Sequence, residues 1–493
     1  MTAAPYAARI ARPDVVLGAI ALAAALAYGA ATLLSGGDVL LLIPLLAATV
    51  IVAVLAHPAI GLYALFGIGL LFEQLTIAGI EPITQTRLFQ NISTYSPLPV
   101  PVSAVDLLML LTVLSAEIRR RREGAALRLG AFGRPVLGYA AVFLVGTVIG
   151  IARGSDFQLD VALNELRGPL TLLILCLLAT NILRDRGQVA VLLSIFMALT
   201  SVKALQAILN YGDAQSLPYA LRAFTSHEDV IFFAAAAAIG LAACVLRVPA
   251  RLAWPLLAMQ PLIWGAELLG NRRTGFVALG VTLSVIALLT LVTTPRRGLV
   301  VVGAGALGAV AFLALFWDAS GPIADPIRAL RSVFDPSSTS LVDQSSDAWR
   351  IIEDRNIAFT MRQLPLTGVG LGQQYLFQLE PSALGFLNWR YIAHNALLWL
   401  WLKAGPLGAL ALWYLVARVL TTSSALYVRL NDAELRLAVA LPITLLVSQV
   451  VFSSVDLGLT YMRTMMVLGT GLGMASFLGQ RADPSTVKAA PSL

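Results

Sequence analysis

Long apolar stretches recur along almost the whole chain, and they constrain its fold more than any other feature. The 493 residues are 58% hydrophobic and only 12% charged, with a mean hydropathy of +0.82. A soluble domain averages about 25% charged residues, whereas about 20 consecutive apolar residues make one membrane-spanning helix. The sequence therefore predicts an all-α polytopic membrane protein.

We expect fourteen spans, within a range of 12–14. They lie at 15–36, 39–56, 58–80, 103–118, 135–152, 168–183, 189–209, 229–246, 252–270, 275–294, 299–317, 394–416, 437–455 and 462–479. The first is expected to be retained, because its apolar run is longer than the core of a cleaved signal. The predicted domains are a membrane bundle with eleven spans (1–317), a long, partly helical loop domain (318–393), and three further spans with a tail (394–493).

Threading these spans from a cytoplasmic N-terminus separates the positive charges. Of the 34 Lys and Arg residues, 19 fall inside, 13 fall outside, and Lys203 and Lys403 fall within spans. Cytoplasmic loops carry the excess of positive charge in membrane proteins, so the net charge of +7 reflects membrane orientation and not nucleic-acid binding. Cys176 and Cys244 both fall within predicted spans, which argues against a disulfide framework.

Two arginines, Arg272 and Arg273, stand in a short link on the predicted outside, where positive charge is disfavoured. Snorkelling to lipid headgroups is one interpretation. The other is an anion site, because a guanidinium offers forked donors that match phosphate oxygens. The start of the next helix would add free N–H groups to such a site.

The long loop contains one predicted helix, in "SSDAWRIIEDRNIAFTMRQLPL". It should begin at an N-cap formed by Ser346 or Asp347 and stop before Pro365. Arg350 precedes two acidic residues by three and four positions, so an intrahelical ion pair is the simplest interpretation. In "TGVGLGQQY" (367–375), the alternating glycines indicate either a loop that lets backbone approach a ligand or a simple turn.

His394 and Asn395 begin the twelfth predicted span, where water meets lipid. His394 is either a generic interfacial residue or a group that accepts a proton near neutral pH. We expect nearby arginines to lower its pKa and keep it neutral. No second His or Cys stands at ligand spacing, so no metal site is predicted. His227, with acidic neighbours at the start of the eighth span, is typical of a helix N-terminus.

Two lysines inside predicted spans require partners, because charge within a membrane is costly and usually faces the bundle interior. Glu267 and Asp106 are candidate partners for Lys203 and Lys403, although the sequence does not pair them. Gly405–Pro406 is expected to break the twelfth span and admit water.

These elements, in this order, resemble the O-antigen ligase and polymerase superfamily (the Wzy/WaaL type). The resemblance covers about residues 220–420 and rests on "RRTG", the long outside loop with "DAWR", "PLTGVGLG", and "HN" followed by apolar residues and "KAGPLG". It implies a fold of the GT-C type in the bacterial inner membrane. It also implies that a polyprenyl-diphosphate-linked glycan is transferred to an acceptor sugar hydroxyl outside that membrane, without a metal, nucleotide sugar or other cofactor.

The resemblance also implies roles for individual residues. Arg273 matches the essential arginine of the "RRTG" motif, with Arg272 as the fallback, and Arg350 matches the loop arginine. These arginines would bind the diphosphate and stabilise the charge that develops as it leaves. His394 would deprotonate or orient the attacking hydroxyl, which inverts the anomeric carbon. The supporting residues would be Asn395, His227 and Lys403. Many members carry an acidic residue at the last of these positions.

Fourteen spans exceed the twelve typical of the ligases, which favours an O-antigen or exopolysaccharide polymerase. A ligase that acts on lipid A core is the alternative, and a lipid-linked glycan transporter or flippase is the alternative from another class. Transporters tend to show repeats and ionisable clusters at the midplane, whereas these charges lie at the outer edge. The expected partners are a lipid-linked glycan donor, a glycan or lipid-linked acceptor, membrane lipids and a chain-length regulator protein.

Overall fold

The structure is a computed structural model, and it describes residues 28–30, 42–74, 82, 84–94, 102–154, 156–214, 224–270, 272–319, 321–334, 341–381 and 388–481. Within these residues the regular structure is helical, apart from one isolated bridge between Asn91 and Ser103. The α-helices are α2 (Leu42–Ala56), α3 (Pro58–Leu71), α4 (Ala104–Arg122), α5 (Gly133–Arg153), α6 (Leu159–Ile182), α7 (Arg186–Ala214), α8 (Asp229–Leu246), α9 (Ala250–Ala258), α10 (Gln260–Leu269), α11 (Arg273–Thr293), α12 (Pro295–Phe316), α13 (Asp325–Phe334), α14 (Leu341–Gln363), α15 (Ala396–Arg429), α16 (Ala433–Ser453) and α17 (Met462–Arg481).

In the described part of the chain, nine helical segments are long and apolar enough to cross a membrane, with α9 and α10 counted as one. This confirms a multi-pass, all-α membrane protein. Helices α2 and α3 are shorter apolar helices. The predicted span 15–36 lies almost entirely outside the described residues, and the predicted span 58–80 is helical only as far as Leu71.

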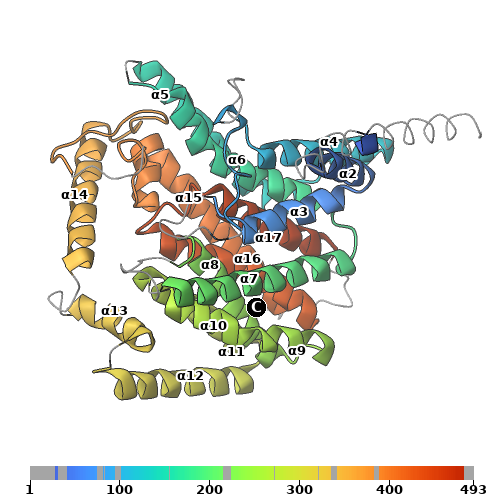
Figure 1. Cartoon of the computed structure of the whole chain (residues 1–493), viewed down its shortest axis with the longest axis vertical. Helices are drawn as coiled ribbons and strands as arrows, with labels where there is room; N and C mark the ends of the chain where they lie inside the picture. Colours follow the sequence, from blue (N-terminus) through green and yellow to red (C-terminus); the bar gives the residue numbers. More distant parts are fainter. Residues whose placement is uncertain are drawn as a thin grey trace, which may run out of the picture.

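The centre of the bundle is formed by α8 and α16, which are buried along almost their whole length. The five consecutive alanines Ala234–Ala238 are all buried, and such small side chains allow α11 and α16 to pack closely against α8. At the periphery, nearly all of α12 is exposed, as expected for a helix that faces lipid. Figure 1 shows α14 along one edge of the bundle, with α13 between α12 and α14.

The loop helix α14 differs from the prediction at its beginning. It starts at Leu341, so Ser346 and Asp347 lie within the helix and not at its N-cap. Its end at Gln363, before Pro365, was predicted. Serine and aspartate favour caps, but tertiary contacts override this weak preference, and Asp347 makes one such contact.

The ends of the bundle helices fall on two faces. We call the face with His227, Arg273 and His394 the site face, and the opposite one, with the links 119–124 and 184–186, the basic face. Ion pairs on the basic face join predicted cytoplasmic links. Links that were predicted to share one side of the membrane therefore lie on the same face of the bundle.

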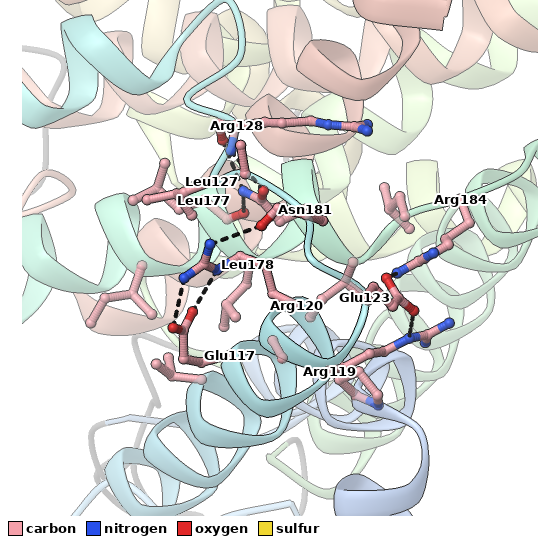
Figure 2. Close-up of a pocket in the computed structure, with 18 residues that line it drawn as sticks. Glu117, Arg119, Arg120, Glu123, Leu127, Arg128, Leu177, Leu178, Asn181 and Arg184 are labelled. Carbon is pink, nitrogen blue, oxygen red and sulfur yellow. Dashed lines mark hydrogen bonds and ion pairs between the residues drawn. The ribbon is translucent and has the colours of Figure 1, made fainter.

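A cavity of about 260 Å³ lies on the basic face, between the end of α4 and α6 (Figure 2). Glu117 accepts two hydrogen bonds of 2.7 Å from Arg120, and Glu123 pairs with both Arg119 and Arg184. Because these arginines already have carboxylate partners, the contacts mainly tie α4 to the link before α7.

The glycine segment, which we define as residues 367–373, lies between α5 and α15. Its backbone N–H groups donate to carbonyl oxygens of both helices, from Val369 to Leu402 (2.8 Å) and from Leu371 to Gly146 (2.9 Å). Gly370 has a φ of +90°, and a Cβ there would lie 2.3 Å from the backbone nitrogen of Gly150. The glycines thus permit close backbone packing against two helices.

The predicted break in the twelfth span is confirmed. Gly405 interrupts α15 with φ 64° and ψ −160°. A Cβ at this position would lie 2.2 Å from the carbonyl oxygen of Leu366, so the kink also accommodates the chain that leaves α14.

Candidate active site

A cavity of about 760 Å³ opens on the site face, between α14 and the bundle. Several distant parts of the chain contribute polar and aromatic side chains to its wall. They include Gln74, Asn91, Asn164, Arg167, His227, Trp349, Arg350, Asn388, His394, Asp456 and Tyr461. Two of the three histidines in the chain therefore line one cavity.

His394 is held by Glu353 of α14. The Glu353 carboxylate accepts hydrogen bonds from the backbone N–H of His394 (3.1 Å) and contacts its Nδ1 at 3.1 Å. The Trp349 ring packs edge-on against the imidazole, with 5.1 Å between centroids. Because Glu353 is buried and holds Nδ1, the Nε2 atom is left for a ligand in the cavity.

The expected lowering of the His394 pKa is wrong. Burial alone would lower this pKa, but the hydrogen bond and charge of Glu353, helped by the charge of Asp456, outweigh burial and raise it. Arg350 has only a small opposing effect. Glu353 therefore makes His394 a stronger base by stabilising the imidazolium.

Asn395 has two structural contacts next to His394. Its side-chain oxygen accepts a hydrogen bond from the backbone N–H of Leu398 (3.2 Å), so it is the N-cap of α15. Its amide nitrogen donates to Asp354 of α14 at 3.4 Å. Asn395 thus joins the start of α15 to the loop helix.

Arg350 and Arg273 meet at one carboxylate. Asp347 accepts two hydrogen bonds from Arg273, at 3.0 and 3.1 Å, and lies 3.6 Å from Arg350. The predicted intrahelical pair between Arg350 and the acidic residues that follow it is wrong, because Glu353 binds His394. Asp347 thus connects α14 to the start of α11.

Arg272 lies in a different environment from its neighbour. It is half-buried, and among the residues that the structure describes its guanidinium makes no hydrogen bond or ion pair. Burial lowers its pKa, against the attraction of Asp456, Tyr461 and Glu228. A desolvated guanidinium without a bonded partner is suited to binding an anion.

His227 is not only a helix-terminal residue. Its Nδ1 lies 3.0 Å from Asp456, whose other oxygen accepts hydrogen bonds from the Tyr461 hydroxyl (3.1 Å) and the backbone N–H of Leu457 (2.7 Å). Burial would raise the pKa of Asp456, but these hydrogen bonds and the charge of His227 hold it well below the usual value.

Lys403 lies outside the cavity wall and has a structural environment. It forms a buried ion pair with Glu165 (3.0 Å) and donates a hydrogen bond to the carbonyl oxygen of Gln373 (2.7 Å). Glu165 also accepts from the backbone N–H of Gly372 at 2.6 Å. The predicted partners of Lys403, Glu267 and Asp106, are therefore wrong. Lys403 anchors the glycine segment.

Lys203 likewise pairs with a residue that the sequence did not indicate. Its ammonium contacts Glu73 and lies 3.8 Å from Asp229. Asp229 in turn binds Arg463, so Lys203 belongs to a buried network that joins α3, α7, α8 and α17.

Sequence reasoning missed Arg167, Asp456 and Arg463. Arg167 lines the cavity and binds Asp106 and Asn91, each at 2.8 Å. Arg463, fully buried, binds Glu228 and Asp229 at 3.0 and 2.7 Å. Charges at the ends of predicted spans were the available signal, but the prediction of membrane orientation used only the Lys and Arg residues.

The fold and cavity define a polytopic membrane protein with a histidine–carboxylate pair and guanidinium groups at one face. Residues 258–413 match the Wzy_C family, described as O-Antigen ligase, and this segment includes Arg272, Arg273, Arg350 and His394. No curated protein matches the chain. The chain thus carries a Wzy_C O-antigen ligase domain, which confirms the resemblance and makes it a membrane glycosyltransferase of polysaccharide biosynthesis.

Proposed function

We propose that this protein transfers a polyprenyl-diphosphate-linked glycan to an acceptor sugar hydroxyl at the periplasmic face of the inner membrane. The observation that carries this proposal is His394, anchored by Glu353, in the same cavity wall as Arg350. In this assignment the site face is periplasmic, both termini are cytoplasmic, and the fold is a fourteen-span bundle of the GT-C type.

The reaction begins with the acceptor hydroxyl. His394 Nε2 takes its proton while Glu353 stabilises the imidazolium that forms. The acceptor oxygen attacks the anomeric carbon from the side opposite the diphosphate, so the configuration inverts. Guanidinium groups balance the charge on the departing diphosphate, and the proposed chemistry therefore needs no metal.

The two neighbouring arginines have separable roles in this proposal. Arg272, without a bonded partner among the described residues, is the better candidate for direct diphosphate binding. Arg273 must break its hydrogen bonds to Asp347 before it can bind the diphosphate. Arg350 must break only its longer contact with the same carboxylate. We retain all three as diphosphate ligands, with Arg272 first.

The test uses purified protein in nanodiscs with a defined polyprenyl-diphosphate glycan. His394→Ala, Arg350→Ala and Arg272→Ala should each lower transfer by at least about 100-fold, while Arg251→Ala, on the basic face, should leave it unchanged. Near-normal activity in the first three variants would refute the assignment. Arg272→Lys should also fail, because an ammonium cannot reproduce the guanidinium fork.

The polymerase is the form of this activity that we favour, because the predicted span count exceeds twelve. Product ladders from the donor alone indicate a polymerase, since one lipid-linked chain then serves as acceptor for another. Product that forms only when lipid A core is added indicates the ligase.

A further inference from the structure

Two histidine–carboxylate pairs face the same cavity. His394 with Glu353 comes from the loop before α15 and from α14, and His227 with Asp456 comes from the start of α8 and the link between α16 and α17. The proposed transfer uses only the first pair. His227 lies outside the segment that matches the Wzy_C family, and the resemblance implies only an unspecified supporting role for it.

The second pair has a fixed geometry. Asp456 is 8% exposed, and both of its oxygens are engaged, one by His227 and the other by Tyr461 and Leu457. Burial together with the charge of Asp456 raises the pKa of Tyr461, so its hydroxyl remains a donor to this carboxylate. Because Asp456 stays ionised, it holds the proton on His227 Nδ1 and leaves Nε2 for the cavity.

The backbone that carries His227 is equally well anchored. The next two residues, Glu228 and Asp229, are buried and bind Arg463 at 3.0 and 2.7 Å. Arg463 also donates to the carbonyl oxygen of Gly69 at 2.8 Å. The imidazole itself remains half-exposed toward the cavity, with 53% of the side chain accessible. An anchored backbone together with a solvent-accessible imidazole is typical of a reacting group.

Guanidinium groups near His227 are suited to binding a substrate anion. Arg272 is within electrostatic reach of Asp456, Glu228 and Asp229 and has no bonded partner among the described residues. Across the cavity, His394 is also close enough to interact with Asp456. The arginines that line the cavity itself are Arg167 and Arg350. A substrate anion between these groups would lie against His227.

Glycan transfer from a diphosphate releases a proton from the acceptor hydroxyl and places negative charge on the departing diphosphate oxygen. We propose that His227, held by Asp456, is the general acid that assists departure of the diphosphate; this role rests on the proposed function. As the bond between the anomeric carbon and the diphosphate oxygen breaks, its electron pair goes to that oxygen, which receives the proton from His227 Nε2. The acceptor proton goes to His394, and the new glycosidic bond completes the balance.

The experiment measures kcat and donor KM against pH for wild type, His227→Gln and His394→Gln. General acid assistance contributes about 10²–10⁴-fold, so His227→Gln should lower kcat by at least about 100-fold, change donor KM less than about threefold, and lose the alkaline limb. His394→Gln should lose the acidic limb instead. His57→Gln is the matched control, because this third histidine is exposed on the basic face.

A second measurement separates acid catalysis from a structural role. In one donor a CH₂ group replaces the oxygen between the two phosphorus atoms, which makes the leaving group more basic. His227→Gln should lose more activity on this donor than on the natural one. Equal losses on both donors, or an alkaline limb that survives in His227→Gln, would overturn the acid role while the proposed transfer stands. If the wild type transfers nothing from the natural donor, the proposed function itself fails.

Discussion

Lys403→Met should destabilise the protein strongly, because it removes one partner of a buried ion pair. The Lys403 ammonium lies 3.0 Å from Glu165, and the two side chains are 1% and 0% exposed. Methionine has a similar length and fits the same space, so packing is largely retained. Breaking a buried pair from one side costs about 3–5 kcal/mol, since the remaining charge is uncompensated.

The loss of unfolding free energy in Lys403→Met should stay within this range, because the Glu165 carboxylate keeps one hydrogen bond. Its other oxygen accepts the backbone N–H of Gly372 at 2.6 Å, which continues to stabilise the carboxylate. Adding Glu165→Gln to Lys403→Met removes the unpaired charge. The double variant should therefore recover stability, with a coupling free energy of about 2–3 kcal/mol.

Equilibrium unfolding in mixed micelles measures the free energies for the two single variants and the double variant. Arg251→Met provides the control, since the Arg251–Glu434 pair spans 3.1 Å but leaves 81% of the arginine side chain exposed. Such a surface pair contributes less than about 1 kcal/mol. A charge-pair role for Lys403 would be refuted if Lys403→Met lowers the free energy of unfolding as little as the control does. It would also be refuted if the effects of the two single variants add up to that of the double variant.

Two other variants test the site through its carboxylates. Glu353→Gln should lower the pKa of His394, since the Glu353 charge raises it. The acidic limb of the pH–rate profile should then move to lower pH, and the maximal rate should fall. An acidic limb that stays at the same pH would show that Glu353 does not control the base. Asp347→Asn should lower the donor KM, because it removes a carboxylate charge that competes with the diphosphate for Arg273 and Arg350, and initial rates over a donor series would show this. A raised KM would mean that Asp347 mainly positions α14.

The positions of several helices along the chain could be predicted well from the sequence, because hydropathy acts locally. The range 229–246 coincides with its predicted span, and the ranges 133–153 and 433–453 differ from theirs by only a few residues at each end. The N-terminus of α14 was harder to predict. Ser346 and Asp347 are good capping residues, and their position inside the helix follows from tertiary contacts that no local pattern contains.

Ionic partners were the part of the site that could not be predicted. Spacing along a helix paired Arg350 with Glu353, but Glu353 binds His394, which is 41 positions further along the chain. The contact between Glu353 and His394 also explains why the predicted direction of the His394 pKa shift was wrong. A nearby arginine would have lowered the pKa of His394, and the carboxylate that occupies its Nδ1 raises it instead.

The two arginines of the "RRTG" motif show how one motif can supply two different groups. Arg272 has extended backbone angles (φ −111°, ψ 112°) as the N-cap of α11, whereas Arg273 is the first helical residue. Consecutive side chains at such a junction diverge, and one contacts Asp347 of the loop helix while the other lies near Asp456. The resemblance assigned one role to this motif, with Arg273 as the first candidate and Arg272 as the fallback. Their separation in space means that the loop helix can be docked by one guanidinium while the other stays available for an anion.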